Sequence, residues 1–443
     1  MFGTSGIRGI ANVEVTPELA LRVGSALVEK AGEIIFVARD TRTSGEMLEN
    51  ALCSGIASAG GEAVRLGIAP TPTLALATRN HASKGVMLTA SHNPPEYNGI
   101  KIFDTQGEIS RSEEEKIAKK VREEKFTRAS WQNFRPTSSY SSAIREHLDL
   151  VLSLVDIDLI SRKKPKVLID AGNAAGSVIT PFALREAGCK VISANCEPSG
   201  FFARGLEPNA DNLSSTSALT RATRADLAIA HDGDADRAII LDEKGELLGL
   251  DSQLALACEE ILAKKKGAIV TTVEASLAVR ESIENSKGKF IQTPVGSLFV
   301  AQEMRKSKAL FGGEPCGEYI YPEGVFVPDG ILAALKYVEL FCEKGKLSAL
   351  KQKIKVYPMK RAKYPCSNKA RAMENISKEA RVVFKGKLND SDGVRVDFED
   401  SWLLMRASGT EPILRITCEA KTQSALDALF AKAEALVKKH SKN

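Results

Sequence analysis

Short apolar runs alternate with helical patterns along the first third of the chain. The apolar runs at 34–38, 63–66 and 85–89 have the length of buried strands, and helical patterns at 46–59 and 73–79 lie between them. Thr16 followed by Pro17 indicates the start of an earlier helix, because a hydroxyl caps a helix and proline fits its first turn. This alternation predicts an α/β domain whose parallel or mixed sheet carries helices on both faces.

The remaining patterns predict three further domains. After a polar stretch at 127–142, which we interpret as a linker, a strand at 166–170 opens a second α/β unit. A third α/β unit runs from a helix at 251–263 to a helix at 330–344, with Gly345 placed to end that helix. The last unit has strands at 394–398, 402–405 and 413–419 and a terminal helix at 424–439, which is typical of an α+β domain. The predicted fold is three similar α/β units with mixed sheets plus a C-terminal α+β domain, with boundaries at 1–140, 141–246, 247–352 and 353–443.

Composition narrows the class of protein. A chain of 443 residues is too long for one ordinary core, and 43% hydrophobic with 26% charged residues is typical of soluble globular proteins. The sequence has no apolar run of eighteen residues, so we expect no membrane span, and it opens inside a motif, so we expect no signal peptide. Eight scattered cysteines without a C-x-x-C pair favour reduced thiols and a cytoplasmic location. A net charge of +5 is too mild to indicate nucleic-acid binding.

One polar loop presents a single hydroxyl directly after an apolar run. Ser91 follows the run at 86–88 and precedes His92, Asn93 and Pro94. Proline cannot continue a strand, because it lacks the N–H group and fixes φ. Ser91 is therefore expected to lie exposed at a strand end, where functional residues concentrate. An ordinary polar turn is the alternative interpretation.

A second loop carries three alternating carboxylates. Asp232, Asp234 and Asp236 follow the apolar run at 227–230, and Gly233 allows the backbone to fold tightly between them. Carboxylate oxygens are preferred ligands of Mg²⁺, so this loop predicts a metal site. The alternative is a solvated acidic turn. No bidentate glutamate stands at the position that an EF-hand requires, and His231 has no second histidine or cysteine nearby, so we interpret it as structural.

Two later loops suit a phosphorylated sugar. Glu314 stands among glycines after the apolar run at 309–311, where a carboxylate can accept hydrogen bonds from sugar hydroxyls. The loop at 406–412 combines Arg406 with hydroxyl and glycine residues, and Arg415 follows it. Guanidinium groups and such backbone N–H groups form anion-binding concavities. Plain surface turns are the alternative for both loops.

The four loops, in this order, resemble those of the α-D-phosphohexomutase family. The segment Gly3-Thr4-Ser5-Gly6-Ile7-Arg8-Gly9 resembles the family's N-terminal signature, and the resemblance extends to about residue 417. It implies four domains around a central cleft, with Ser91 as the phosphoserine. The resemblance implies these further roles: Mg²⁺ held by Asp232, Asp234, Asp236 and Ser91; reacting groups flanked by Arg8, His92 and Lys101; sugar recognition by Arg237, Glu314, Cys316 and Glu318; phosphate binding by Arg406, Ser408, Gly409, Thr410 and Arg415.

The implied reaction moves a phosphoryl group between O6 and O1 of a hexose or hexosamine phosphate through a sugar 1,6-bisphosphate. We assign Lys101 and Arg8 as the proton-transfer and charge-stabilising pair. Cys316 and Glu318 depart from the commonest family pattern, which has serine and histidine there, and an extra carboxylate would suit the amino group of glucosamine phosphate. A non-catalytic phosphosugar-binding protein on the same fold is the alternative. A simple phosphatase lacks support, because a hydrolase needs no separate loop for a distal phosphate.

Overall fold

The computed structural model describes residues 6–408 and 411–441. The chain divides into two compact units, one formed by residues 1–248 with 316–350 and the other by residues 249–315 with 351–443. None of the described helices is long and apolar enough to cross a membrane.

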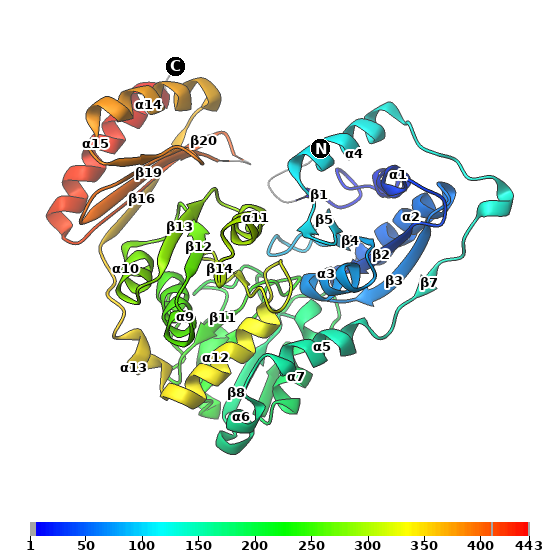
Figure 1. Cartoon of the computed structure of the whole chain (residues 1–443), viewed down its shortest axis with the longest axis horizontal. Coiled ribbons are helices and arrows are strands. Elements are labelled where there is room, and N and C mark those ends of the chain that lie inside the picture. The colour runs from blue at the N-terminus through cyan, green and yellow to red at the C-terminus, as the bar shows by residue number, and fades with distance from the viewer. Residues whose placement is uncertain (1–5, 409–410, 442–443) are drawn as a thin grey trace. The chain divides into compact units, whose positions relative to one another are not determined.

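The N-terminal domain is built on a mixed seven-stranded sheet with the order β1-β5-β4-β2-β3-β7, and β6 pairs with β5 (Figure 1). Its strands are β1 (Ile7–Ile10), β2 (Ile34–Arg39), β3 (Glu62–Ile68), β4 (Lys84–Leu88), β5 (Tyr97–Asp104), β6 (Gly107–Glu108) and β7 (Ser138–Ser139). Its helices are α1 (Pro17–Leu27), α2 (Gly45–Ser58), α3 (Thr71–Asn80), α4 (Arg111–Glu123) and the short 3₁₀ helix η1 (Trp131–Asn133).

Alternating side chains of the central strands build two cores on opposite faces of this sheet. Ile35 and Val37 of β2 join the core under α1 and α2, whereas Phe36 and Ala38 join the core under α3. This period of two is the reason why such strands are apolar throughout. The predicted α/β layers are confirmed, and the polar stretch at 127–142 contributes the edge strand β7, whose exposed serines gave no hydrophobic signal.

The second sheet of the first unit has the order β11-β10-β8-β9, and only the β10–β11 pair is antiparallel. Its strands are β8 (Lys166–Asp170), β9 (Lys190–Ala194), β10 (Leu227–Ala230) and β11 (Ile239–Leu241). The other elements of this part of the unit are α5 (Ala143–Ser153), α6 (Ile157–Lys163), the 3₁₀ helix η2 (Ala175–Val178), α7 (Thr180–Glu186), α8 (Ser214–Thr223), β15 (Tyr319–Ile320) and α12 (Gly330–Lys344). Helix α12 packs against α5, α6 and α7, and Gly345 follows its last residue, as predicted.

The second unit begins with three parallel strands, because β12 pairs with both β13 and β14. The elements here are α9 (Leu250–Lys264), β12 (Ala268–Thr272), α10 (Leu277–Asn285), β13 (Lys289–Thr293), α11 (Ser297–Ser307) and β14 (Phe311–Gly313). Helix α10 begins at the Ser276 cap, whose hydroxyl accepts a hydrogen bond from Val279 N.

The C-terminal domain has an antiparallel sheet with the order β16-β20-β19-β18-β17. Figure 1 shows α14 and α15 on one face of this sheet, where they cover an apolar core. The elements are α13 (Leu347–Lys351), which precedes the domain, β16 (Met359–Pro365), α14 (Lys369–Val383), β17 (Lys387–Asn389), β18 (Val394–Asp397), β19 (Ser401–Ala407), β20 (Ile413–Ala420) and α15 (Gln423–Ser441). The predicted α+β architecture is confirmed, although the sequence patterns did not identify β16 or α14.

Candidate active site

Ser91 lies just beyond the end of β4 and is buried rather than exposed. Only 3% of the residue is accessible, and its backbone has a left-handed φ of 50°. The expectation of an exposed serine is wrong because the aspartate loop closes over it. A Cβ atom at Gly233 would lie 2.3 Å from the carbonyl oxygen of Ser91, so only glycine permits this approach.

The Ser91 hydroxyl is in contact with the acidic loop. Its Oγ donates a hydrogen bond of 2.6 Å to Asp232 Oδ2 and lies 3.2 Å from His92 Nδ1. Two segments that are 141 residues apart in the sequence thus meet at one hydroxyl. This contact brings together the serine and the carboxylates that the sequence analysis singled out separately.

Asp232, Asp234 and Asp236 follow β10 and form a buried cluster. One carboxylate oxygen from each lies within 4.8 Å of the others, an arrangement that could hold a metal ion. Asp234 Oδ2 accepts hydrogen bonds from Thr71 Oγ1 at 2.6 Å and Lys101 Nζ at 2.9 Å. The Oδ1 atoms of Asp234 and Asp236 are buried and accept no hydrogen bond within residues 6–408 and 411–441.

The three carboxyl groups differ in acidity because of their surroundings. Burial, and then the charge of Asp234, raises the pKa of Asp232 to about 7. Burial and both neighbouring carboxylates raise the pKa of Asp236 well above its ordinary value. Burial also opposes ionisation of Asp234, but the charge of Lys101 and the hydrogen bond from Thr71 outweigh it and lower its pKa. Asp234 is therefore the carboxyl group of the cluster that most strongly favours its ionised form.

The predicted basic residues Lys101 and Arg8 lie beside the aspartate cluster and the loop that carries Ser91. Lys101 on β5 is 6% exposed, and its Nζ lies 2.9 Å from Asp234 and 3.5 Å from Asp236. Burial lowers the pKa of Lys101, but the charges of Asp234 and Asp236 outweigh it, so the net shift is upward. Arg8 on β1 donates a 2.8 Å hydrogen bond to the side chain of Asn93. Asn93 lies in the loop between β4 and β5 that carries Ser91, here called the serine loop.

His92 and His231 are both neutral near neutral pH. Burial and the charges of Arg237 and Arg8 lower the pKa of His92 to about 3, while its Nε2 lies 3.5 Å from Glu207. Burial lowers the pKa of His231 to about 4. His231 is 0% exposed, with Nε2 2.9 Å from Thr180 Oγ1 and Nδ1 2.6 Å from the carbonyl oxygen of Arg237. Both ring nitrogens thus have partners inside the protein, which supports the interpretation of His231 as structural.

Glu318, which stands where the family commonly has histidine, is paired with Arg237. Its Oε1 accepts a hydrogen bond from Arg237 Nε at 3.1 Å and forms an ion pair with a terminal guanidinium nitrogen at 3.0 Å. The two residues also form an isolated β-bridge. The negative charge of Glu318 is therefore balanced by Arg237, which weakens the expectation that this carboxylate serves an amino group of the sugar. Cys316 lies in the same unit and is partly buried.

The remaining predicted residues belong to the second unit. Glu314 follows β14, and its Oε2 accepts a 3.1 Å hydrogen bond from Gly296 N. Arg406 on β19 pairs with Glu274 at 2.9 Å and with Asp392 at 3.5 Å. The predicted phosphate-binding residues Gly409 and Thr410 lie outside the described residues.

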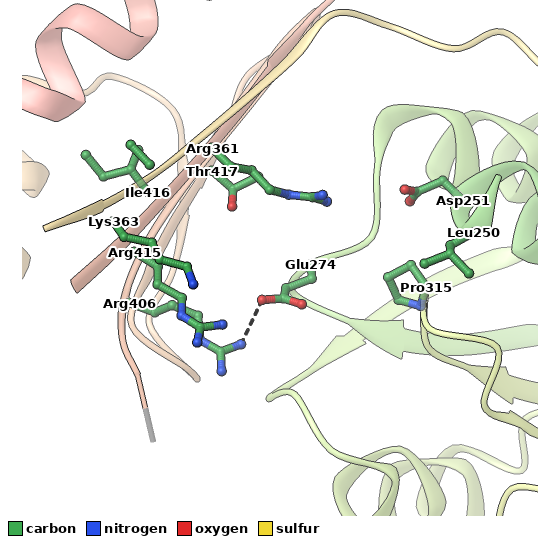
Figure 2. Close-up of a pocket in the computed structure, with 11 residues that line it drawn as sticks. Leu250, Asp251, Glu274, Pro315, Arg361, Lys363, Arg406, Arg415, Ile416 and Thr417 are labelled. Atoms are coloured by element: carbon green, nitrogen blue, oxygen red, sulfur yellow. Dashed lines mark hydrogen bonds and ion pairs between the residues drawn. The ribbon is translucent and has the colours of Figure 1, made fainter. Parts of the chain in front are cut away.

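Cations of the C-terminal sheet line a pocket of about 660 Å³ in the second unit. Figure 2 shows Arg406, Arg415 and Lys363 extending from this sheet, with Glu274 opposite them. Arg415 pairs with Glu411 at 2.7 Å and lies 3.4 Å from Ser408 Oγ. The pocket thus combines guanidinium, ammonium and hydroxyl groups, which are the usual ligands of a phosphate.

The pairing register brings three of these cations into one row. Lys363 of β16 lies opposite Arg415 of β20, and Arg415 lies opposite Arg406 of β19. Like charges directly opposite each other on a sheet are destabilising, so such a row favours an anion between them. The sequence analysis missed Lys363, because the cation-rich segment 360–363 carries no motif.

Arg42 is a second residue that the sequence analysis missed. It is 1% exposed, and it donates hydrogen bonds to the carbonyl oxygens of Ser91, Asn93, Pro94 and Tyr97. The available signal was an arginine in the loop that follows a buried strand, three residues beyond the end of β2. Its contacts show that the serine loop is held by the loop that follows β2 as well as by its own strand.

Comparisons with known proteins cover nearly the whole chain. Four domain models of the phosphoglucomutase/phosphomannomutase family match this chain in succession. The model of alpha/beta/alpha domain I matches residues 1–128, domain II residues 145–245, domain III residues 250–357 and the C-terminal domain residues 359–436.

Curated relatives match the chain end to end. A protein of Thermococcus gammatolerans named "Probable phosphoglucosamine mutase" is 44% identical over 444 residues, covering 99% of this chain and 98% of that protein. A "Phosphoglucomutase/phosphomannomutase" of Thermococcus kodakarensis is 39% identical over 436 residues, covering 96% of this chain and 95% of that protein.

Solved structures share the fold. A phosphoglucomutase/phosphomannomutase family protein of Burkholderia thailandensis matches with a TM-score of 0.88 at 23% identity, covering 99% of this chain and 97% of that one. N-acetylphosphoglucosamine mutase of Aspergillus fumigatus, solved with GlcNAc-6P and magnesium, matches with a TM-score of 0.64 at 16% identity, covering 99% and 96%.

The four successive domain matches and the full-length relatives show that the chain belongs to the phosphoglucomutase/phosphomannomutase family. It is a phosphohexomutase, an isomerase that transfers a phosphoryl group within one sugar phosphate.

Proposed function

We propose that the chain interconverts the 6-phosphate and 1-phosphate of glucosamine through phosphorylated Ser91 and a sugar 1,6-bisphosphate. The observation that carries the proposal is the 2.6 Å hydrogen bond between Ser91 Oγ and Asp232 inside the buried aspartate cluster. A hydroxyl held against candidate metal ligands is suited to carrying a phosphoryl group, because phosphoryl transfer depends on positioning and charge stabilisation.

The aspartate cluster fits Mg²⁺. One oxygen from each of its three carboxylates lies within 4.8 Å of the others. The buried Oδ1 atoms of Asp234 and Asp236 accept no hydrogen bond from the part of the chain that the structure describes, so they suit a cation. Ser91 adjoins the cluster and would add a phosphate oxygen once phosphorylated. A bound Mg²⁺ would supply positive charge beside the phosphoryl oxygens. Its binding would also favour the ionised forms of Asp232 and Asp236.

The transfer step conserves atoms and charge. A sugar hydroxyl oxygen forms a bond to phosphorus, the bond between phosphorus and Ser91 Oγ breaks, and Oγ retains that electron pair. The proton released by the sugar hydroxyl ends on the Ser91 hydroxyl. Lys101 is buried, and its raised pKa favours the charged form, which supports charge stabilisation rather than proton removal as its role. Arg8 holds Asn93 of the same loop and His92 adjoins Oγ, so both belong to the reacting region.

The pocket of the second unit is proposed to hold the phosphate that is not transferred. Arg406 and Arg415 line the pocket with guanidinium groups, and the Ser408 hydroxyl lies 3.4 Å from Arg415. Gly409 and Thr410 are assigned to the same phosphate on their sequence position alone. Lys363 lies in register with both arginines and adds a positive charge. A phosphate monoester carries nearly two negative charges at neutral pH, which suits a pocket that combines several cations.

Replacing Arg406 with glutamine is expected to lower kcat/KM without removing the phosphoserine chemistry. A hydrogen bond to a charged group contributes about 1.5–3 kcal/mol, which corresponds to roughly 10- to 150-fold in kcat/KM. Steady-state kinetics would measure this loss, and phosphorylation of Ser91 by glucose 1,6-bisphosphate should stay detectable by mass spectrometry. Arg381→Gln is the control, because Arg381 lies in the same domain and pairs with Asp390 at an exposed position. Wild-type kinetics in Arg406→Gln would contradict the assignment.

The proposed sugar preference rests on the names of the relatives rather than on the Glu318 carboxylate. Seven relatives at 41–44% identity carry the phosphoglucosamine mutase name, whereas the one at 39% is named phosphoglucomutase/phosphomannomutase. We therefore expect a higher kcat/KM with glucosamine 6-phosphate than with glucose or mannose 6-phosphate. Coupled assays of the three substrates with one enzyme preparation would measure the ratio. A higher value with either neutral sugar would assign the chain to the second activity.

A further inference from the structure

Both main-chain polar groups of Ser91 are tied to one buried carboxylate oxygen. Ser91 N donates a 2.8 Å hydrogen bond to Thr89 Oγ1, and Thr89 Oγ1 donates one of 2.6 Å to Asp40 Oδ2. On the other side, the carbonyl oxygen of Ser91 accepts a 2.8 Å hydrogen bond from Arg42, whose Nε donates to the same Asp40 Oδ2 at 3.0 Å. Asp40, Thr89 and Arg42 are 0%, 1% and 1% exposed.

Arg42 uses every N–H donor of its guanidinium group to hold Asp40 and the serine loop. Besides the bonds to Asp40 and Ser91, it donates to the carbonyl oxygens of Pro94 at 2.5 Å, Asn93 at 2.7 Å and Tyr97 at 2.9 Å. These five bonds account for all five N–H donors of an arginine, which stand in a fixed planar fork. The shape of the serine loop is therefore set by a rigid group rather than by the loop's own turns.

The loop needs such support because Ser91 has an unfavourable backbone conformation. Its φ of 50° lies in the left-handed region, which residues with a Cβ atom avoid unless the surroundings enforce it. The two tethers act directly on the N–H and C=O groups that flank this φ angle. They thereby fix the direction in which the Cβ–Oγ bond of Ser91 points, toward Asp232.

We infer that Thr89, Asp40 and Arg42 are positioning residues that aim the phosphate-bearing oxygen of Ser91 at the aspartate cluster. The inference rests on the proposed role of Ser91. The Thr89 hydroxyl is the central link, because a hydroxyl both accepts a hydrogen bond and donates one. Without it, Ser91 N loses its acceptor and Asp40 loses a donor, so the left-handed conformation loses one of its two tethers. A displacement of the reacting atom by about 1 Å lowers an enzymatic rate by on the order of 10²-fold.

The test compares Thr89→Val, which removes the hydroxyl at nearly constant shape, with Thr89→Ser, which restores it. Thr89→Val is expected to lower kcat by on the order of 10²-fold with KM unchanged, and Thr89→Ser is expected to recover most of that loss. Thr78→Val is the matched control, because Thr78 is 0% exposed in the same domain and its hydroxyl donates to the carbonyl oxygen of Ala75, away from the serine loop. Thr78→Val should keep the wild-type kcat.

A second readout separates positioning from stability. In a single turnover, isolated phosphoenzyme of Thr89→Val should transfer its phosphate to a sugar monophosphate about 10²-fold more slowly than wild type. Its affinity for Mg²⁺, measured by calorimetry, should be unchanged. Arg42→Lys, which keeps the charge but loses the fork, should show the same kinetic pattern.

Two results would overturn the inference. One is a wild-type transfer rate in Thr89→Val. The other is a Thr89→Val protein that does not fold, which would assign the hydroxyl to stability. Failure of the underlying proposal looks different, because wild-type protein would then carry no transferable phosphate at Ser91.

Discussion

Replacing Ser91 with alanine is expected to reduce mutase turnover to background while leaving the fold intact. Ser91 supplies the oxygen that donates and takes back the phosphoryl group in the proposed reaction, and alanine removes that atom alone. The hydroxyl makes one short hydrogen bond, to Asp232, and no tether of the loop depends on it. Intact-mass measurement should detect a phosphate on active wild-type protein and none on Ser91→Ala.

A matched control distinguishes the chemistry of Ser91 from general sensitivity to losing a buried hydroxyl. Ser25 is also 3% exposed in the same domain, and its hydroxyl donates to the carbonyl oxygens of Leu21 and Gly55 in the α1–α2 contact. Ser25→Ala should retain turnover, with at most a lower melting temperature. Measurable turnover in phosphate-free Ser91→Ala would disprove the role of Ser91.

Replacing Asp236 with asparagine is expected to lower kcat by about 10²–10³-fold, the range found when one group that stabilises transition-state charge is removed. Asparagine keeps the shape of the side chain but removes the charge that a cation would neutralise. Asp236 has a buried Oδ1 that accepts no hydrogen bond among the described residues, so its loss should weaken metal binding more than it weakens the loop. Kinetics and calorimetric titration with Mg²⁺ would measure both effects.

Asp242→Asn provides the comparison for this prediction. Asp242 is 0% exposed in the same part of the chain, and its Oδ1 accepts hydrogen bonds from Lys244 N and Glu246 N. Its replacement should alter stability but not the affinity for Mg²⁺. Treatment of wild-type enzyme with EDTA should abolish turnover and added Mg²⁺ should restore it. Turnover that withstands EDTA would show that the aspartate cluster serves another purpose.

Local patterns were sufficient to predict the layers of the fold. Apolar runs such as that at 34–38 are strands of a sheet buried on both faces, and the pattern at 46–59 is helix α2. The missed elements have a common physical reason. Strand β16 carries Arg361 and Lys363 on the face that lines the charged pocket, and Lys360 precedes Ala362 and Tyr364 on the other face, so its sequence shows no hydrophobic alternation. Both residues of the edge strand β7 are exposed serines, so the strand carries no hydrophobic period.

The candidate site was predicted loop by loop, but its geometry was not. Spacing indicated that Asp232, Asp234 and Asp236 could converge, and the structure places one oxygen of each within 4.8 Å of the others. Spacing could not show that Ser91 is buried, because the residues that cover it are 141 positions away. The pairing of Glu318 with Arg237 was hidden for the same reason, and it changed the meaning of that carboxylate.

The sequence by itself determined the family, the order of the α/β domains and the residue types available for phosphoryl transfer. These properties follow from local hydrophobic periods and short motifs, which need no knowledge of distant contacts. Only the tertiary structure decided which charges neutralise one another, which carboxyl groups have raised pKa values, and how Thr89, Asp40 and Arg42 hold Ser91. Burial, hydrogen bonding and electrostatic interaction depend on distance in space, and the chain brings these groups together only when its sheets and loops have folded.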